Sequence, residues 1–394
     1  MKGNRSEVLI VSGVGFLRAY AGTIYLVQAL VSMNKKVRVL VTATAKEAEE
    51  YARLNLNIHC LIRRKPPGLA RKIETLVHHF AILRAILRSP GVIITENGYL
   101  YEAAIAKWLA GDRLVLGHYC QELHLPEEYP NIPRIALLSR LASVPDFVVD
   151  VEPNRARVRM ERLGLRKMPI VLRNTLHAGS LPQRTPPGTL ARLADRQLPQ
   201  DRPILIHMGG IGREKPLERV IDAVAMCKAP VFFLAFCNGS TEQIAGLNHY
   251  ASRKLSTCHF AILGPRKREE LLAAAWEADI GIVDYSPSVE DTSNQRYCAP
   301  TKLYEFMALG LAVVGSDNDS LRDIIVTENI GLCAEDGSTA ALAAALENVA
   351  HDPTRLRSMK ERAIQCFGSK HSYEALCLPA VQQVCEALEG NTVN

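Results

Sequence analysis

The sequence lacks the features of a disulfide-bonded, zinc-binding or membrane-spanning protein. Its ten cysteines are scattered, with no Cys-x-x-Cys pair and no histidine-rich neighbourhood. This spacing indicates reduced thiols that mostly fill cores, as in the cytosol. No apolar run approaches the roughly 20 residues that a membrane span needs. Near the N-terminus the apolar run covers only residues 8–11, so we expect a first strand there and no signal peptide.

The charge is unevenly divided along this globular, 394-residue chain, which is long enough for two domains. Residues 1–180 contain 26 basic and 15 acidic residues (+11), whereas the rest contains 21 and 26 (−5). A basic half favours an anionic partner, such as a phosphorylated acceptor, a lipid-phosphate acceptor or a membrane surface. The alternative is a solvated basic surface with no partner. The basic amphipathic helix expected over residues 69–88 leaves the same choice open, because it can lie on a membrane or simply cover a sheet.

The order of the expected elements favours an α/β protein with two doubly wound parallel sheets. A strand over residues 7–12, a turn with Gly13 and Gly15, a helix and a strand over residues 36–42 form a βαβ unit. Residues 181–203 contain five prolines and no strong periodicity, which is typical of a linker. A second series of strands and helices follows. We therefore predict domains over residues 1–180 and 204–370 that face each other across a cleft, and a C-terminal helical segment over residues 371–394.

Polar residues follow two strands that we expect in the first domain. In open parallel sheets, ligands bind beyond the carboxyl ends of the strands. Glu96 and Asn97 follow the strand over residues 92–95, and His118 and Glu122 follow the strand over residues 113–117. His118 is either functional or a satisfied interior histidine, and Glu122 is either a base or a structural carboxylate.

A glycine-rich loop opens the second domain. After a strand over residues 204–207, Gly209 and Gly210 free the backbone to approach phosphates, and Arg213 and Lys215 supply positive charge. The loop lacks the Gly-Lys-Ser/Thr ending of a Walker loop. The alternative is a pair of solvated cations at a strand–helix turn.

The most informative segment is residues 299–317, APTKLYEFMALGLAVVGSD. Pro300 suits the first turn of a helix that Gly310 ends. Thr301 and Lys302 lie in that first turn, where free N–H groups attract anions. Glu305 is four residues after Thr301 and shares its face, so it can accept hydrogens from the two hydroxyls of a ribose. This face suits a nucleoside diphosphate, although a solvated amphipathic helix has the same spacing.

This segment resembles the signature of glycosyltransferase family 4, the retaining GT-B glycosyltransferases also called glycosyl transferases group 1. The resemblance implies two Rossmann-like domains, an N-terminal one for the acceptor and a C-terminal one for a nucleotide sugar. It also implies that Glu305 holds the ribose, while the backbone before it approaches the diphosphate and the sugar. The family often has another glutamate eight residues earlier, where this chain has Tyr297, so the identity of the sugar stays open.

The resemblance extends to the other candidates. It implies donor binding by Gly13, Gly15, Gly209, Gly210, Asn238, Leu263, Pro300, Thr301, Lys302, Leu303 and Glu305. Glu96 and Asn97, at their strand end, are the candidates for acceptor binding. His118, Glu122, Arg213 and Lys215 are the expected catalytic residues. Arg213 and Lys215 would stabilise the departing diphosphate together with the helix N-terminus, which can replace a metal ion.

We therefore expect a metal-independent, retaining hexosyltransferase without a cofactor. Its partners would be a UDP- or GDP-sugar and an acceptor that is a sugar, a lipid-linked sugar or a small natural product, with no nucleic acid. Its location would be cytoplasmic, either free or peripheral on the inner face of the membrane. We see neither an Asp-x-Asp motif nor a histidine cluster for a metal.

Other functions stay open. The same fold serves sugar-nucleotide epimerases and phosphorylases. Two alternatives belong to a different class of function: a nicotinamide-dependent oxidoreductase and a non-catalytic nucleotide-binding protein. The first βα loop is only Gly-x-Gly, and Thr42-Ala-Thr44 stands where a dinucleotide site needs an acidic residue, which disfavours the oxidoreductase.

Overall fold

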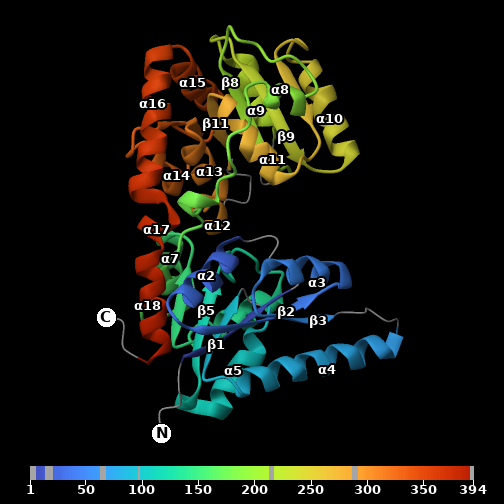
Figure 1. The fold of residues 1–394 in the computed structure, drawn as a ribbon, viewed down its shortest axis with the longest axis vertical. Helices are drawn as coiled ribbons and strands as arrows, with labels where there is room; N and C mark the ends of the chain where they lie inside the picture. The colour runs from blue at the N-terminus through green and yellow to red at the C-terminus, as the bar shows by residue number, and fades with distance from the viewer. Residues whose placement is uncertain are drawn as a thin grey trace. The chain divides into compact units, whose positions relative to one another are not determined.

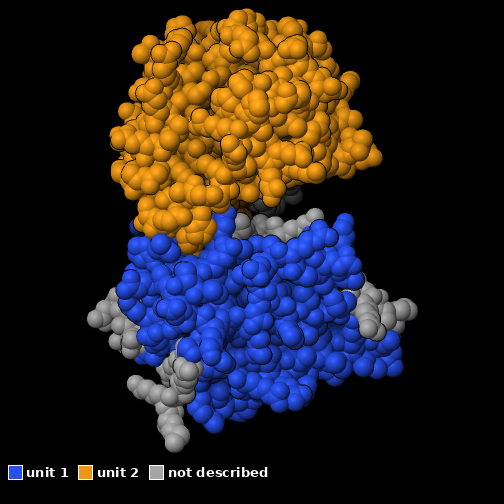
Figure 2. Space-filling model, viewed as in Figure 1, with its two compact units in different colours: residues 1–173, 377–394 blue, residues 174–376 orange. Residues whose placement is uncertain are grey.

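The computed structural model describes residues 6–13, 21–62, 68–95, 98–212, 217–285 and 292–390. The chain forms two compact units: unit 1 comprises Met1–Arg173 and Cys377–Asn394, and unit 2 comprises Asn174–Leu376 (Figure 2). The boundary thus precedes the predicted one at residue 180. Residues 181–203, which we expected to be a linker, pack within unit 2. The N–H of Thr185 donates to the carbonyl of Ala273 at 2.9 Å, and the N–H of Gly188 donates to Glu277 at 2.8 Å.

Unit 1 contains a seven-stranded parallel sheet with the strand order β3-β2-β1-β4-β5-β6-β7 (Figure 1). Its strands are β1 (Glu7–Ser12), β2 (Lys36–Ala43), β3 (Ile58–Ile62), β4 (Gly91–Thr95), β5 (Val115–Cys120), β6 (Phe147–Asp150) and β7 (Ile170–Val171). Its helices are α2 (Ala21–Ser32), α3 (Ala45–Tyr51), α4 (Gly68–Leu87), α5 (Leu100–Ala110), α6 (Pro133–Arg140), α7 (Pro153–Leu163) and α18 (Leu378–Leu388). The order changes direction between β1 and β4, which is the switch point where such sheets bind ligands.

Helix α18 belongs to unit 1 although it ends the chain. It contacts α2, β5 and β7, and Lys35 donates to Glu389 at 2.6 Å just beyond its last turn. Its apolar side is buried, including Val381, Val384 and Leu388. The apolar spacing of this segment therefore serves the core of unit 1.

Unit 2 contains a six-stranded parallel sheet with the order β10-β9-β8-β11-β12-β13. Its strands are β8 (Ile204–Gly210), β9 (Phe232–Asn238), β10 (Phe260–Leu263), β11 (Ile280–Val283), β12 (Ala312–Gly315) and β13 (Gly331–Cys333). Its helices are α8 (Thr189–Leu193), α9 (Leu217–Met226), α10 (Thr241–Ser252), α11 (Arg268–Ala274), α12 (Ser293–Arg296), α13 (Thr301–Leu309), α14 (Asp319–Ile325), α15 (Thr339–Ala350), α16 (Pro353–Cys366) and α17 (Tyr373–Leu376). Here the switch point lies between β8 and β11.

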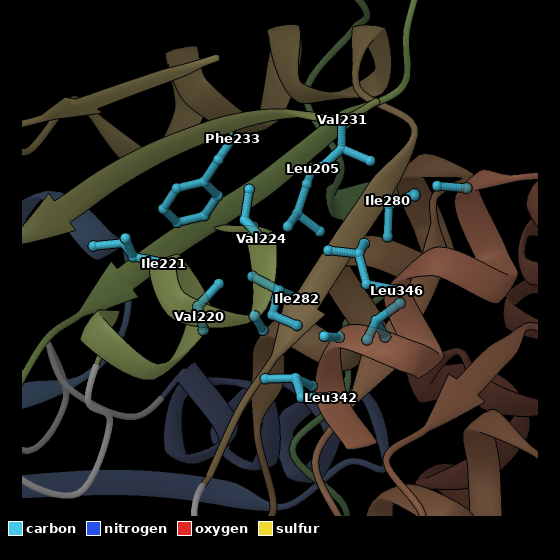
Figure 3. Packing of buried hydrophobic residues seen from close by; sticks show 14 of the residues in the cluster. Leu205, Val220, Ile221, Val224, Val231, Phe233, Ile280, Ile282, Leu342 and Leu346 are labelled. Atoms are coloured by element: carbon cyan, nitrogen blue, oxygen red, sulfur yellow. The ribbon is translucent and has the colours of Figure 1, made fainter. Parts of the chain in front are cut away.

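The core of unit 2 lies between its sheet and helices α9 and α15 (Figure 3). Leu205, Phe233 and Ile282 from the strands meet Ile221 from α9 and Leu346 from α15, and all are buried. Buried strands in parallel sheets are apolar on both faces, which explains the continuous apolar runs of the sequence. This packing fixes the strand ends that carry the candidate residues.

A buried carboxylate ties the end of α16 to the rest of unit 2. Glu328 accepts hydrogen bonds from Lys370 Nζ at 2.9 Å and Cys366 Sγ at 3.2 Å, and it contacts His371 Nε2 at 3.2 Å. Burial acts to raise the pKa of Glu328, but these hydrogen bonds outweigh it and lower the pKa to about 2. The ionised form of Glu328 therefore stabilises this corner.

Candidate functional site

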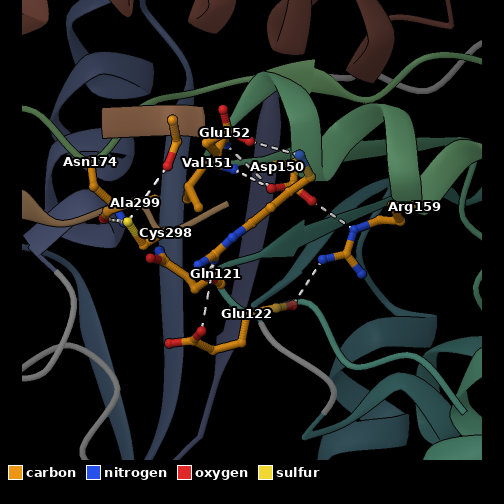
Figure 4. Close-up of polar contacts among 11 residues, drawn as sticks. Gln121, Glu122, Asp150, Val151, Glu152, Arg159, Asn174, Cys298 and Ala299 are labelled. Atoms are coloured by element: carbon orange, nitrogen blue, oxygen red, sulfur yellow. Dashed lines mark hydrogen bonds and ion pairs between the residues drawn. The ribbon is translucent and has the colours of Figure 1, made fainter. Parts of the chain in front are cut away.

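Helix α13 has the start and the end that the sequence predicts. Pro300 is its N-cap with an extended backbone, and Gly310 ends it in the left-handed conformation at φ 76°. The side chain of Pro300 makes no capping hydrogen bond to the first turn, and the N–H groups at Thr301 and Lys302 point out of the helix end. The amide of Asn174 donates to the carbonyl of Ala299 at 3.2 Å, directly before the helix (Figure 4). This contact holds the backbone that enters α13.

Glu305 lies one turn inside α13 and is only 8% exposed. Its carboxylate pairs with the guanidinium of Arg268, the first residue of α11. Arg268 is itself more than half exposed, so it can move more easily than the carboxylate. A buried carboxylate that faces a mobile cation can exchange part of that pairing for the hydroxyls of a bound polyol.

Lys302 sets the charge of this edge of the sheet. Its ammonium lies over the ring of Tyr285, 5.6 Å from the centroid. The neighbouring Asp284 follows β11, is buried, and lies 3.4 Å from Arg219 of α9. Burial raises the pKa of Asp284, even though the positive charges of Arg219 and Lys302 act to lower it. Arg219 is thus paired with Asp284, and Lys302 adds a further positive charge near this carboxyl edge of unit 2.

The other donor-side candidates lie along the same edge. Gly209 and Gly210 are the last residues of β8 rather than part of a loop, because Gly210 pairs with Asn238 at the end of β9. Gly209 has φ 129°, and a Cβ at either glycine would meet no atom of the described residues within 4 Å. Leu263 ends β10. Leu303 is buried, so only its backbone is available to a ligand.

Five of the predicted residues lie outside the described part of the chain: Gly15, Glu96, Asn97, Arg213 and Lys215. Gly13 is described, directly after β1, and a Cβ there would lie more than 4 Å from every other part of the chain that the structure describes. Among the described residues, no group of three or more histidine, cysteine or acidic side chains could hold a metal ion.

His118 lies elsewhere than expected. Strand β5 runs over Val115–Cys120 rather than residues 113–117, so His118 is inside the strand and not beyond its end. It is 3% exposed, and its Nδ1 lies 3.4 Å from the sulfur of Cys120. The prediction of the strand end was wrong because Tyr119 and Cys120 continue the pairing with β4 and β6. The catalytic role of His118 stays a prediction.

Glu122 lies in a loop that two buried arginines hold (Figure 4). Arg155 donates to the carbonyl of Gln121 at 2.7 Å and lies 3.7 Å from the Glu122 carboxylate. Arg159, one turn later on α7, donates to the carbonyl of Glu122 at 2.8 Å and to Asp150 at 2.7 Å. The backbone of Glu122 is thus fixed, while its side chain is about one third exposed. This position suits a polar contact with a ligand of unit 1.

Sequence reasoning missed the residues that support these candidates. Arg268 and Arg219 each lie in the first turn of a helix that follows a strand, and that position was the available signal. Arg155 and Arg159 are four residues apart after the strand that ends with Asp150, so their shared face was also visible. Which partners they reach depends on the tertiary structure.

Comparisons with known proteins agree with the geometry of unit 2. The family model described as glycosyl transferases group 1 matches residues 192–365, a range that includes every candidate from Gly209 to Glu305. These residues belong to the glycosyl transferases group 1 family. The match confirms the resemblance seen in the sequence and supports sugar transfer as the activity. No curated protein sequence matches the chain.

Solved structures show that the fold is GT-B. Anabaena HepE in complex with UDP-glucose superposes with a TM-score of 0.72 at 15% identity, over 98% of this chain and 99% of that one. Sucrose-phosphate synthase from Thermosynechococcus elongatus gives 0.67 at 15% identity, over 96% and 97%. The α,α-trehalose 6-phosphate synthase from Burkholderia multivorans gives 0.69 at 12% identity, over 98% of each chain. At these identities the similarity establishes the fold alone.

Proposed function

We propose that this chain is a retaining hexosyltransferase that moves a sugar from a UDP- or GDP-sugar to a hydroxyl of an acceptor without a metal ion. The observation that carries the proposal is Glu305, a buried carboxylate one turn inside a helix whose N-cap is Pro300, within the segment that matches the glycosyl transferases group 1 family. A diphosphate at the helix N-terminus and a ribose on Glu305 use both features at once.

In this proposal the donor lies along the carboxyl edge of the sheet in unit 2. The N–H groups at Thr301 and Lys302 and the ammonium of Lys302 bind the diphosphate. Arg213 and Lys215 are assigned the same task from the sequence. The UDP-glucose in the structure of Anabaena HepE supports a uridine donor.

The chemical step breaks the bond between the anomeric carbon and the diphosphate oxygen, and its electron pair leaves with the diphosphate. The acceptor hydroxyl forms the new bond on the same face of the sugar, which retains the configuration. Its proton passes to the departing diphosphate. Positive groups aimed at the diphosphate stabilise the charge that develops there, which is the contribution that a metal ion makes in other transferases.

A panel of nucleotide sugars tests this function. Each of UDP-glucose, UDP-galactose, GDP-mannose and NAD is titrated by calorimetry, and donors that bind are then incubated with candidate acceptors in the presence of EDTA. We expect binding of a UDP- or GDP-sugar, transfer that EDTA does not abolish, and a product whose anomeric configuration by NMR equals that of the donor.

Other outcomes would replace the proposal. Full-rate release of the free sugar or its phosphate without an acceptor indicates attack by water or inorganic phosphate. Conversion of the donor into its epimer indicates an epimerase. Binding of NAD without binding of any nucleotide sugar would exclude glycosyl transfer.

A further inference from the structure

Helix α4 packs on unit 1 through one side only. Ile82 and Ile86 are buried in a core cluster that also includes residues of β1, β4 and α5. One turn earlier, His78 lies 2.8 Å from the hydroxyl of Thr42 on β2. Residues 78, 82 and 86 are spaced by four and therefore share one side of the helix. The opposite side is the outer surface of the unit.

That outer side is apolar, which is unusual for the solvent face of a helix. Leu69 is 73% exposed, Leu76 is 72% exposed and Phe80 is 65% exposed. Six large apolar side chains of α4 are exposed in all: Leu69, Ile73, Leu76, Val77, Phe80 and Leu87. At 3.6 residues per turn, all but Val77 fall on one narrow stripe. Scattered exposed leucines are ordinary, whereas a continuous stripe marks a contact surface.

Helix α5 extends this stripe. It lies beside α4 and contacts it (Figure 1). It covers the same core cluster through Ala103 and Ala106. The opposite side of α5 exposes Ile105 and Trp108, and Trp108 is 83% exposed. Tryptophan is enriched where an apolar phase meets water. The stripe of α4 together with Ile105 and Trp108 is called the α4–α5 face below.

Charge identifies the surface that this face suits. Residues 63–88 contain seven basic residues and one acidic residue, a net charge of +6 that equals the net charge of the whole protein. The rest of the chain contains 40 basic and 40 acidic residues. Lys72, Arg84 and Arg88 from this stretch are exposed beside the apolar stripe, and Arg71 is exposed on the other side of the helix. Such a charge opposes pairing with a second copy of the same face and attracts an anionic surface.

We propose that the α4–α5 face docks on an anionic phospholipid bilayer. The apolar side chains enter the interfacial region of the bilayer, and the flanking lysine and arginine side chains lie among the phosphates of the headgroups. The chain would lie on the membrane without crossing it, and in the described ranges no helix is long and apolar enough for a span. This inference rests on unit 1 alone and does not depend on the activity proposed above.

Sedimentation with vesicles tests the docking of the full-length protein without any donor. We expect binding to vesicles of phosphatidylcholine mixed with phosphatidylglycerol, weaker binding at higher salt, and little binding to phosphatidylcholine alone. On binding, Trp108 leaves water, so its fluorescence shifts to shorter wavelengths. The Trp108→Phe variant removes this shift and leaves Trp276, the only other tryptophan, as the background.

A double variant, Leu76→Glu with Phe80→Glu, tests the apolar stripe. It places two charges among the side chains that enter the bilayer, so we expect binding at least about tenfold weaker. The control is Met226→Glu, which changes a half-exposed apolar residue of α9 in unit 2 and should bind vesicles as the wild type does. Because all three positions are exposed, the thermal unfolding midpoints should stay close to that of the wild type.

Three results would overturn the proposal. The first is no binding of the wild type to anionic vesicles, and the second is equal binding to neutral and anionic vesicles. The third is unchanged binding of a double variant that unfolds at the wild-type temperature. A wild type that ignores vesicles but forms a dimer in sedimentation velocity, which the double variant abolishes, would instead assign the face to a second copy of the chain.

Discussion

Replacing Glu305 by glutamine is the sharpest test of the donor site, because it removes one charge and keeps the shape of the side chain. Glu305 is buried in the first turns of α13 and has Arg268 as its partner in the described structure. A hydrogen bond to a charged group contributes about 1.5–3 kcal/mol, which corresponds to a dissociation constant for UDP or GDP that is about 10–150-fold higher. The midpoint of thermal unfolding should fall only slightly, because Arg268 is exposed to water and such an ion pair contributes about 0–1 kcal/mol to the stability of the fold.

Isothermal titration calorimetry measures this change directly. The matched control is Glu270→Gln, the same substitution on α11 at an exposed carboxylate that pairs only with Lys267 at 3.2 Å among the described residues. The control should bind the nucleotide as the wild type does. A comparison of UDP with uracil separates the ribose contact from the base contact, because only a ligand that carries ribose should lose affinity in the Glu305→Gln variant.

Two results would refute this reasoning. If the Glu305→Gln and Glu270→Gln variants bind the nucleotide equally well, Glu305 does not hold the ribose and its role is the ion pair with Arg268. If Glu305→Gln loses affinity but also unfolds many degrees below the wild type, the carboxylate supports the fold of α13. In that case Arg268→Ala should cause the same loss of stability.

Three further predictions concern stability. Arg159→Met leaves its buried aspartate partner without the ion pair, so urea unfolding should show a loss of about 3–5 kcal/mol. The hydrogen bonds that Glu328 accepts lower its pKa to about 2, although burial acts to raise it. The ionised carboxylate therefore stabilises the folded state fully above the pKa of about 4.5 that Glu328 has in the unfolded chain, and this contribution is lost as the pH falls from there towards 2. Glu328→Gln should therefore flatten the dependence of the unfolding midpoint on pH in that window. Gly281→Ala places a Cβ 2.3 Å from the ring of Phe306 and should cost at least about 1–3 kcal/mol, whereas Gly246→Ala in open space on α10 should be neutral or stabilising.

Much of the fold was accessible from the sequence because its periodicities are local. Helix α4 differs from the expected helix over residues 69–88 by one residue at each end. Strand β3 and helix α16 were not predicted. The side chains of β3 are only partly buried, so its apolar signal is weak. Helix α16 has a strongly polar sequence and becomes recognisable through its contact with α13.

The candidate site was predictable in part for the same reason. The spacing of Thr301 and Glu305 and the glycine that ends α13 are properties of one helix. The position of His118 was not, because the length of β5 is decided by pairing with the strands on both sides of it. The partners of Glu305 and Glu122 were not predictable either, since each pairing joins helices that start after different strands.

The sequence by itself determined which residues share a helix face, where α13 begins and ends, and that unit 2 carries the segment of a glycosyl transferase. Those properties follow from 3.6 residues per turn and from the conformations open to proline and glycine. Only the tertiary structure decided that Arg268 faces Glu305, that two arginines of α7 hold the loop at Glu122, and that α4 buries one apolar side and exposes another. Strand order and packing bring together residues that are distant in the chain, and no local pattern encodes which of two apolar sides a sheet will cover.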